Sequence, residues 1–270
     1  CQTRICSDSS SLKSALKALE IFESIGTPYE TIKSYIIIAV SYFNLGDFQK
    51  SHQYNQLALQ FARKHNDKEN ESMILFNIGS IYTNQNEYSL ALENLLASLD
   101  VEEKRNNDEG IAFCLNELAH IYTTIHMDSL AESYYLRSLA IFRKKKYMLE
   151  QAIIFHNLGD LYASRNQFGK ADSSFRESLK IKHKLGIVSS IALTSYRFGE
   201  LFFQQGIKDS ADAYYLKAIN GAEQSGREQY KASALLGYGK SMLMDKNYKQ
   251  AEKLFLESED IAYRLGLNEI

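Results

Sequence analysis

The 270-residue chain has no tryptophan, a single proline and three cysteines. Three is an odd number, so these cysteines do not form a disulfide framework. Pro28 is the only proline, which leaves long stretches without the residue that most strongly breaks helices. No run of 18 apolar residues is present, and no signal peptide is visible, so the sequence predicts no transmembrane helix.

A strong charge of either sign is also missing. The net charge is −2 and the isoelectric point is about 6.4, which argues against general nucleic-acid binding because that function needs a basic surface. One basic run stands out, at residues 143–146. We expect it at the C-terminus of a helix, where cations interact favourably with the helix dipole.

What the chain does have is a repeat. A small residue recurs every 40 residues: Ala39, Gly79, Ala119, Gly159, Gly199 and Gly239. Large, mostly aromatic residues lie three positions after these markers, and small residues lie 12 and 19 positions after them. Sixteen positions after the marker the residue is bulky in five units, with Asn55 as the exception: Leu95, Tyr135, Phe175, Tyr215 and Phe255. Such spacings predict a solenoid whose unit is two antiparallel helices.

This pattern resembles the tetratricopeptide repeat (TPR). Residues 75–82 and 155–162 are similar to the first helix of that motif, and residues 88–91 and 168–171 to the start of its second helix. The resemblance extends over about residues 32–270. It implies an all-α, right-handed superhelical solenoid of helix-turn-helix units, with six repeats and an N-terminal half repeat.

The repeat departs from the usual TPR in length. The usual unit has about 34 residues and often carries a tryptophan and a terminal proline. Without that proline the second helix continues for another turn or more, which accounts for the longer unit. This longer variety resembles the repeats of kinesin light chains, of G-protein signalling modulators and of bacterial peptide-sensing regulators. Units three and five have Asp128 and Lys208 where other units have an aromatic residue near the turn, so we expect looser turns there.

We divide the chain into an N-terminal part, residues 1–28, and one continuous domain of six repeats, residues 29–270. In the first part, residues 1–9 are polar and expected to be frayed, and residues 10–25 form the half-repeat helix. First helices are predicted near 29–44, 68–84, 108–124, 148–164, 188–204 and 228–244. Second helices are predicted near 47–65, 87–105, 127–145, 167–185, 207–225 and 247–265.

Both ends leave alternatives open. The last helix carries Leu254, Phe255, Ile261 and Ala262, and part of this surface would normally meet a following helix. It is exposed, or covered by another chain through self-association, or followed by more protein. Cys1 is a trimmed boundary or the lipidated start of a bacterial lipoprotein, so the compartment is cytoplasmic or periplasmic. Cys114 is expected to be buried and inert.

The resemblance also implies where a partner binds. In TPR proteins the first helices line a concave face, with inward residues at fixed offsets from the small marker. In the central units these offsets give Phe76, Asn77, Ser80, Phe113, Asn116, Glu117, His120, His156, Asn157, Asp160, Tyr196, Arg197 and Glu200. We expect this face to bind an extended peptide, with asparagine side chains pairing with its backbone and Arg197 binding a carboxylate. In unit one the face is apolar, and Ile36, Ile37 and Val40 either pack against the N-terminal helix or form a partner-binding patch.

Other functions have less support. His156 and Asp160 lie four apart on one helix, and His120 and Glu117 lie on the preceding first helix, a grouping that could hold zinc. Polar residues on an inner face often produce such groupings, and no zinc motif is present, so no metal or cofactor is predicted. No nucleophile elbow, phosphate loop or dinucleotide fingerprint is found, so no enzymatic activity is predicted. The alternative to a free-standing scaffold is the sensory part of a larger bacterial signalling protein, such as a histidine kinase or a helix-turn-helix regulator.

Overall fold

The computed structural model describes residues 2–266, and from residue 10 onward it describes side chains as well. Within these residues the fold is all-α, with 13 helices and no strand. Their bounds are α1 (Gln2–Ile25), α2 (Pro28–Asn44), α3 (Phe48–Lys64), α4 (Lys68–Asn84), α5 (Tyr88–Arg105), α6 (Asp108–Thr124), α7 (Asp128–Lys145), α8 (Met148–Ser164), α9 (Phe168–Leu185), α10 (Val188–Gln204), α11 (Lys208–Ser225), α12 (Glu228–Met244) and α13 (Tyr248–Leu265).

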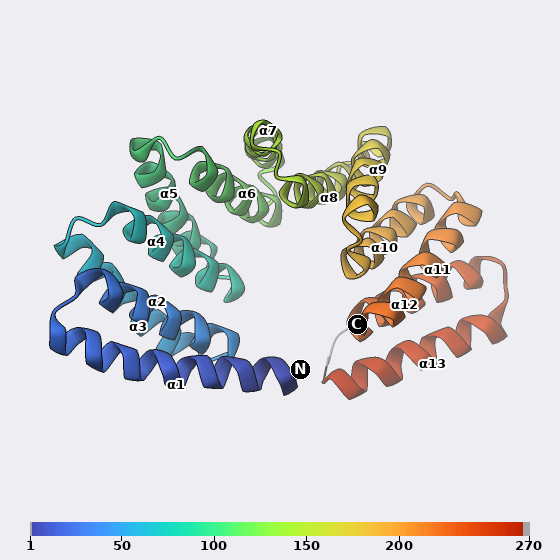
Figure 1. Cartoon of the computed structure of the whole chain (residues 1–270). Coiled ribbons are helices and arrows are strands. Elements are labelled where there is room, and N and C mark those ends of the chain that lie inside the picture. The colour runs from blue at the N-terminus through green and yellow to red at the C-terminus, as the bar shows by residue number, and fades with distance from the viewer. Residues whose placement is uncertain (1, 267–270) are drawn as a thin grey trace. The chain divides into compact units, whose positions relative to one another are not determined.

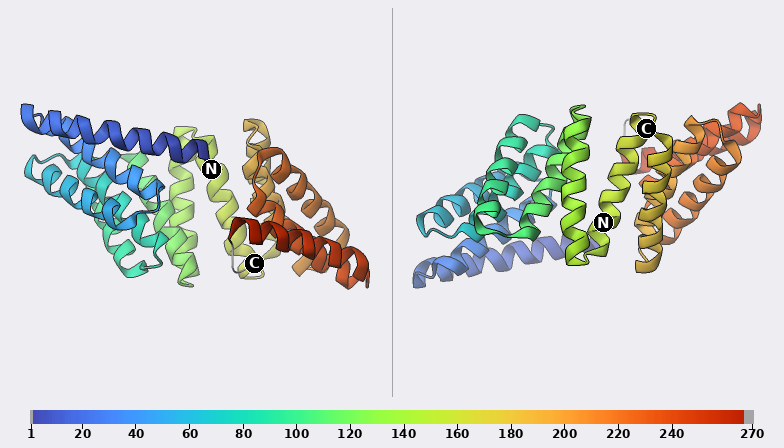
Figure 2. Two further views of the ribbon diagram at one scale, coloured as in Figure 1. Left: turned by 90° about the horizontal axis from the view of Figure 1, so that it is seen from below. Right: turned by 90° about the horizontal axis from the view of Figure 1, so that it is seen from above.

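The helices form two compact units, residues 1–141 and 142–270. We call these the N-terminal unit and the C-terminal unit, and the numbered units one to six remain the repeats. Helices adjacent in the sequence pack against one another from α1 to α6 and from α8 to α13, and Figure 2 shows them as antiparallel rods. First helices also contact first helices: α2 meets α4 and α4 meets α6 in one unit, and α8 meets α10 and α10 meets α12 in the other. The face formed by these first helices, which we call the first-helix face of each unit, can be followed in Figure 1.

The predicted helices agree with the observed ones to within about a residue in units one to six. The exception is the N-terminal segment. Residues 1–9 were expected to be frayed, but α1 begins at Gln2, so this expectation is wrong from that residue onward. No proline or glycine precedes Gly26, so nothing in the local sequence stops the helix from extending toward the N-terminus. Cys1 lies outside the described residues.

Each helix ends at a residue with a left-handed backbone, and these residues recur every 20 positions from 26 to 266. Most are glycine or asparagine, the residues that adopt positive φ at least cost. The turns after α6 and α10 follow the same scheme, with His126 at φ 59° and Gly206 at φ 72°. The looser turns expected in units three and five are therefore not found. Lys208 instead forms ion pairs with Asp212 and Asp245, which link the turns of units five and six.

Lys246 offers a test of this backbone rule, because it is an exposed, non-glycine residue at φ 58°. A left-handed conformation costs a residue with a Cβ about 1–2 kcal/mol, and substitution by glycine removes this cost. Part of the benefit is lost because glycine gives the unfolded chain more conformational entropy. We therefore expect Lys246→Gly to raise the free energy of unfolding by about 0.5–1 kcal/mol in urea titrations. The matched control, Lys253→Gly at an exposed position in the interior of α13, should lower it by about 1 kcal/mol. A loss of stability in both variants would contradict the assignment of Lys246 to a helix-ending turn.

The small markers allow the two helices of a unit to approach closely, as the sequence predicted. A Cβ on Gly159 would lie 2.6 Å from the Phe175 ring, and one on Gly239 would lie 2.4 Å from the Phe255 ring. Gly79 and Gly199 meet Leu95 and Tyr215 in the same way. The bulky residue 16 positions after the marker therefore packs directly onto the marker of its own unit.

The apolar residues singled out in unit one and on the last helix differ in how far they are buried. Ile36 is buried in a cluster with Ala15 and Leu19 of α1, whereas Ile37 and Val40 are exposed. On α13, Leu254, Ile261 and Ala262 are buried within the unit, so they are not the surface that a following helix would meet. The exposed apolar residues of that helix are instead Tyr248, Leu256, Tyr263 and Leu265. Of the basic run predicted at a helix C-terminus, Arg143, Lys144 and Lys145 lie in the last turn of α7, and Lys146 is the left-handed residue that follows it.

Candidate functional site

The first-helix face of the N-terminal unit carries the predicted residues of repeats two and three. Phe76, Asn77 and Ser80 lie on α4 and are half-buried. On α6, Phe113 and His120 are exposed, and Asn116 and Glu117 are half-buried. The amide of Asn116 donates to the Glu117 carboxylate at 3.2 Å. Burial raises the pKa of Glu117, even though His120 and this hydrogen bond act in the opposite direction.

Two of these aromatic residues share a pocket. Phe76 and Phe113, from neighbouring first helices, line a cavity of about 200 Å³ together with Met73, Ser72, Ser98, Glu102, Gly110 and Cys114. Its polar groups are already paired, since the hydroxyls of Ser72 and Ser98 lie 3.0 Å apart and Ser98 lies 3.3 Å from the Cys114 thiol. Burial raises the pKa of Cys114 to about 11. This thiol is therefore buried and protonated at neutral pH, which agrees with the inert role predicted from the sequence.

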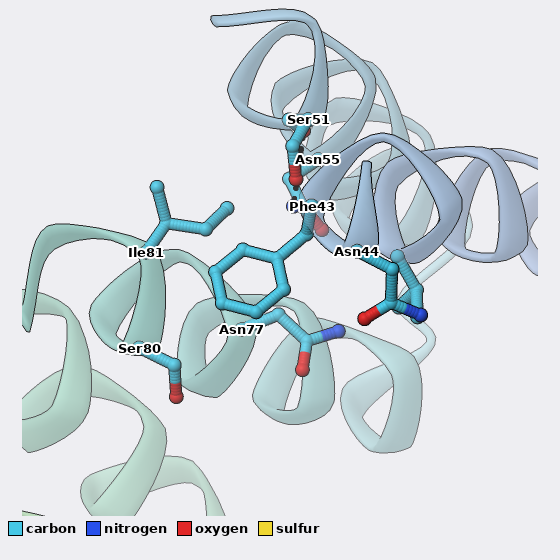
Figure 3. A pocket seen from close by; sticks show the side chains of 8 residues that line it. Phe43, Asn44, Ser51, Asn55, Asn77, Ser80 and Ile81 are labelled. Atoms are coloured by element: carbon cyan, nitrogen blue, oxygen red, sulfur yellow. Dashed lines mark hydrogen bonds between the residues drawn. The ribbon is translucent and has the colours of Figure 1, made fainter. Parts of the chain in front are cut away.

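A second pocket lies between α2, α3 and α4 and has a volume of about 250 Å³. Its lining residues are Val40, Phe43, Asn44, Ser51, Asn55, Asn77, Ser80 and Ile81. Figure 3 shows Ser51 and Asn55 on one side of the Phe43 ring and Asn77 and Ser80 on the other. Of the predicted site residues, Asn77 and Ser80 therefore contribute to a pocket that also includes second-helix residues, which the sequence analysis did not assign to any site.

The first-helix face of the C-terminal unit is more highly charged. On this face Asp160 of α8 accepts a hydrogen bond from Arg197 of α10, with 2.8 Å between Oδ1 and Nε. Asp160 also lies 3.6 Å from Nε2 of His156. Nearby, the phenol of Tyr215 donates to the carboxylate of Glu200 at 2.5 Å. The predicted residues of repeats four and five are thus joined by ion pairs and hydrogen bonds. Asn157 on α8 and Tyr196 on α10 are half-buried beside them.

Beneath this face lies a buried basic network. Lys182 of α9 is 3% exposed and donates to the Thr194 hydroxyl at 2.6 Å. The same hydroxyl lies 3.2 Å from Nδ1 of His156 and donates to the Ser190 carbonyl at 3.0 Å. Burial lowers the pKa of Lys182 to about 8, against a smaller opposing effect of Asp160. Burial likewise lowers the pKa of His156 to about 4, so this imidazole is neutral at pH 7.

Comparisons with known proteins agree with this repeat architecture. Family models described as tetratricopeptide repeat match residues 70–144 and residues 152–184. The chain carries tetratricopeptide repeats. No protein in a search of curated sequences matches the TPR chain.

Solved structures show the same fold at low identity. The apo form of RapI has a TM-score of 0.75 and 18% identity, over 95% of this chain and 93% of that one. A Rap protein complexed with Competence and Sporulation Factor has a TM-score of 0.71 and 15% identity, over 98% of this chain and 73% of that one. A STAND protein from Pyrococcus horikoshii with a tetratricopeptide repeat sensor has a TM-score of 0.72 and 20% identity. That match covers 87% of this chain and 36% of the STAND protein. These likenesses show the TPR fold of the chain.

The TPR register did not predict the buried basic network. The position 23 residues after the marker carries Ala62, Glu102, Phe142, Lys182, Ala222 and Ala262 in the six units. Three repeats have alanine at this position, so the lysine is the sequence feature that would have indicated the buried network. The residue pairing with it, Thr194, occupies a position that holds isoleucine in units two and four, at Ile74 and Ile154.

Among the residues that the structure describes, no group of three or more His, Cys, Asp or Glu side chains is arranged to hold a metal ion. No helix in the described part of the chain has the length and apolar character needed to cross a membrane.

Proposed function

We propose that the chain is a non-catalytic binding scaffold whose first-helix faces bind an extended peptide or protein segment. The observation that carries this proposal is the state of two asparagines. In the described part of the chain, the side-chain amides of Asn77 and Asn157 have no hydrogen-bond partner. Both residues are half-buried, so part of each side chain is open to a ligand. Each amide supplies donors and an acceptor, which match the N–H and C=O groups repeated along a peptide backbone.

The apolar groups of the N-terminal unit support the same function. Phe76 and Phe113 flank an open pocket, and Met73 beside them is exposed. Apolar pockets next to a few polar groups are typical of binding sites in which the apolar contacts provide affinity and the polar groups fix orientation. The two kinds of group occur together on the first-helix face.

Arg197 has a more restricted role in this proposal. Its Nε already donates to Asp160, so a peptide carboxylate would compete with that ion pair. Because a guanidinium has five N–H donors, it can bind a second carboxylate while it keeps the first. A carboxylate-bearing peptide would then be bound by Arg197 at the cost of repulsion from Asp160.

The proposal is tested by selecting binders from a random 12-residue peptide library and measuring their affinity by calorimetry. We expect Asn77→Ala combined with Asn157→Ala to weaken the selected peptides by roughly tenfold or more. Each lost hydrogen bond contributes about 1 kcal/mol, and each 1.4 kcal/mol is a factor of ten in affinity. The melting temperature should change little, because neither amide stabilises the folded chain through a hydrogen bond.

Asn94→Ala combined with Asn220→Ala is the matched control. These asparagines also lie one in each unit, but on the second helices α5 and α11. This control should bind the selected peptides as the unchanged protein does. If both double variants bound the selected peptides with equal affinity, the first-helix faces would not be the binding site.

A sensory role inside a longer signalling protein is the second candidate. The observation that favours it is the likeness to the STAND protein, in which a tetratricopeptide repeat sensor is one part of a longer chain. In that case the same faces would bind the signal molecule. The sequence of the full reading frame distinguishes the two candidates, since only the sensor requires a kinase, ATPase or DNA-binding domain in the same polypeptide.

A further inference from the structure

Unit one lacks the bulky residue that fills the space between the helices of the other repeats. In units two, four, five and six, a leucine, tyrosine or phenylalanine packs against the small marker, and unit three has a buried tyrosine at the same position. In unit one the marker is Ala39 and the corresponding residue is Asn55, whose side chain is polar and smaller in volume. The 250 Å³ pocket between α2, α3 and α4 lies at this position and is lined by Asn55 itself.

Two residues that line this pocket carry buried polar atoms without a hydrogen-bond partner in the described chain. Ser51 is 0% exposed and Asn55 is 1% exposed, and both line the pocket. The Asn55 amide nitrogen donates to the Ser51 carbonyl at 3.0 Å, which directs the amide oxygen elsewhere. Within the described chain, neither that oxygen nor the Ser51 hydroxyl has a hydrogen-bond partner. Buried polar atoms are almost always paired, so two such atoms in one cavity point to a ligand group that pairs with them.

The chemistry of the lining restricts what this group can be. No charged side chain lines the pocket, and a buried charge without a counter-ion is costly, so the group is neutral. Val40, Phe43 and Ile81 provide apolar walls that suit a flat hydrocarbon body. The Asn55 oxygen needs a donor, and the Ser51 hydroxyl can donate to an acceptor. A single hydroxyl at the end of an aromatic ring satisfies both atoms, whereas an indole N–H can only donate.

We infer that this pocket, the Asn55 pocket, binds a tyrosine side chain of the bound peptide, with the phenol donating to Asn55 and accepting from Ser51. Asn77 and Ser80 belong both to the pocket and to the first-helix face, so a peptide on that face passes its entrance. The inference rests on the proposed function, since the tyrosine is part of the peptide bound there. It adds an anchoring residue to that function and places it in the first repeat.

The pocket is tested without any peptide by titrating the protein with p-cresol, the side-chain analogue of tyrosine, in ¹H–¹⁵N NMR. We expect saturable shifts of signals from residues 51–55. Toluene, which lacks the hydroxyl, should bind about tenfold more weakly, since it forms neither hydrogen bond. Equal affinity for both compounds would reduce the pocket to an apolar cavity, and no saturable binding of p-cresol would mean that it holds only water. Either result overturns the inference.

Two variants complete the test. Asn55→Leu introduces the residue found at the same position of unit two, whose side chain has nearly the same length, so it removes the acceptor oxygen without filling the pocket and should weaken p-cresol about fivefold. Ser51→Ala introduces the residue found in the other five units, so it removes one hydrogen bond without filling the pocket. It should weaken p-cresol about fivefold and leave toluene unchanged. Unaltered p-cresol binding in Asn55→Leu would place the ligand elsewhere and sink the inference.

The outcome is separable from that of the proposed function. If library peptides bind the first-helix faces and lose affinity in Asn77→Ala with Asn157→Ala, but bind Asn55→Leu unchanged, only the tyrosine pocket is wrong. If p-cresol binds as expected and no peptide is selected, the pocket stands as a phenol site and the peptide scaffold falls.

Discussion

Phe175→Ala is expected to lower the free energy of unfolding by about 3–5 kcal/mol, the usual cost of removing a buried aromatic ring. The ring is fully buried, and its centroid lies 5.5 Å from that of Phe198 and 6.0 Å from that of His156. Because it also packs directly against Gly159, its removal opens a cavity between the two helices of repeat four. Urea unfolding followed by far-ultraviolet circular dichroism measures the effect, which suits a chain without tryptophan.

The control for this prediction changes Gly159, the residue against which the Phe175 ring packs. Gly159→Ala alone should destabilise the protein by about 1–3 kcal/mol, because its Cβ would lie 2.6 Å from the Phe175 ring. In the Phe175→Ala background the same change should be neutral or stabilising, since the ring is gone and alanine favours a helix over glycine by about 1 kcal/mol. If Gly159→Ala had the same effect in both backgrounds, the close approach of the two helices would not be what requires a glycine here.

Lys182→Met is expected to stabilise the protein at pH 7 by about 1–3 kcal/mol, because methionine removes a buried charge and keeps much of the volume. The sign follows from the pKa of Lys182, which is 10.5 in the unfolded chain and about 8 in the folded one. Below pH 8 the lysine is charged in both states, and the folded state carries the full cost of burying that charge. Between pH 8 and 10.5 the folded lysine loses its proton first, so the unchanged protein becomes more stable.

The advantage of Lys182→Met should therefore be largest below pH 8 and should disappear as the pH approaches 10.5. Urea titrations of both proteins at several pH values across this range measure it. Thr194 still donates to Ser190 in the variant, so its hydroxyl is not left without a partner. Lys180→Met, at an exposed position of the same helix, is the matched control and should show no such pH dependence. An advantage that persisted at pH 10.5 would indicate better packing as the cause.

The sequence predicted the repeat and its helices because both depend on local, periodic features. The small markers and the bulky residues 16 positions later meet in the structure, as Gly159 and Phe175 show. The left-handed turn residues follow from the recurring glycines and asparagines, although His126 and Lys246 adopt the same conformation without that preference. There the packing of the flanking helices outweighs the local cost, which a reading of turn residues does not include.

The site was predictable only as a set of positions. The offsets placed Asn77 and Asn157 on first helices, but they did not show that Arg197 is already paired with Asp160 or that Glu200 accepts from Tyr215. Such pairs depend on side-chain rotamers across neighbouring helices, and repeat register does not determine these. Asn55 was visible as an exception in the register, yet the pocket beside it required the structure, because a change of residue type does not reveal whether the neighbouring side chains close the space.

The regular stride of 20 residues between left-handed turns has a consequence for how such a chain changes over evolution. Unequal recombination that duplicates or deletes 40 residues joins equivalent turns and returns every side chain to an equivalent environment. An insertion of any other length must be accommodated in a turn or must shift glycines such as Gly159 away from the rings that they accommodate. Unequal recombination can therefore lengthen or shorten this protein by whole repeats, while smaller insertions and deletions inside its helices would disrupt their packing.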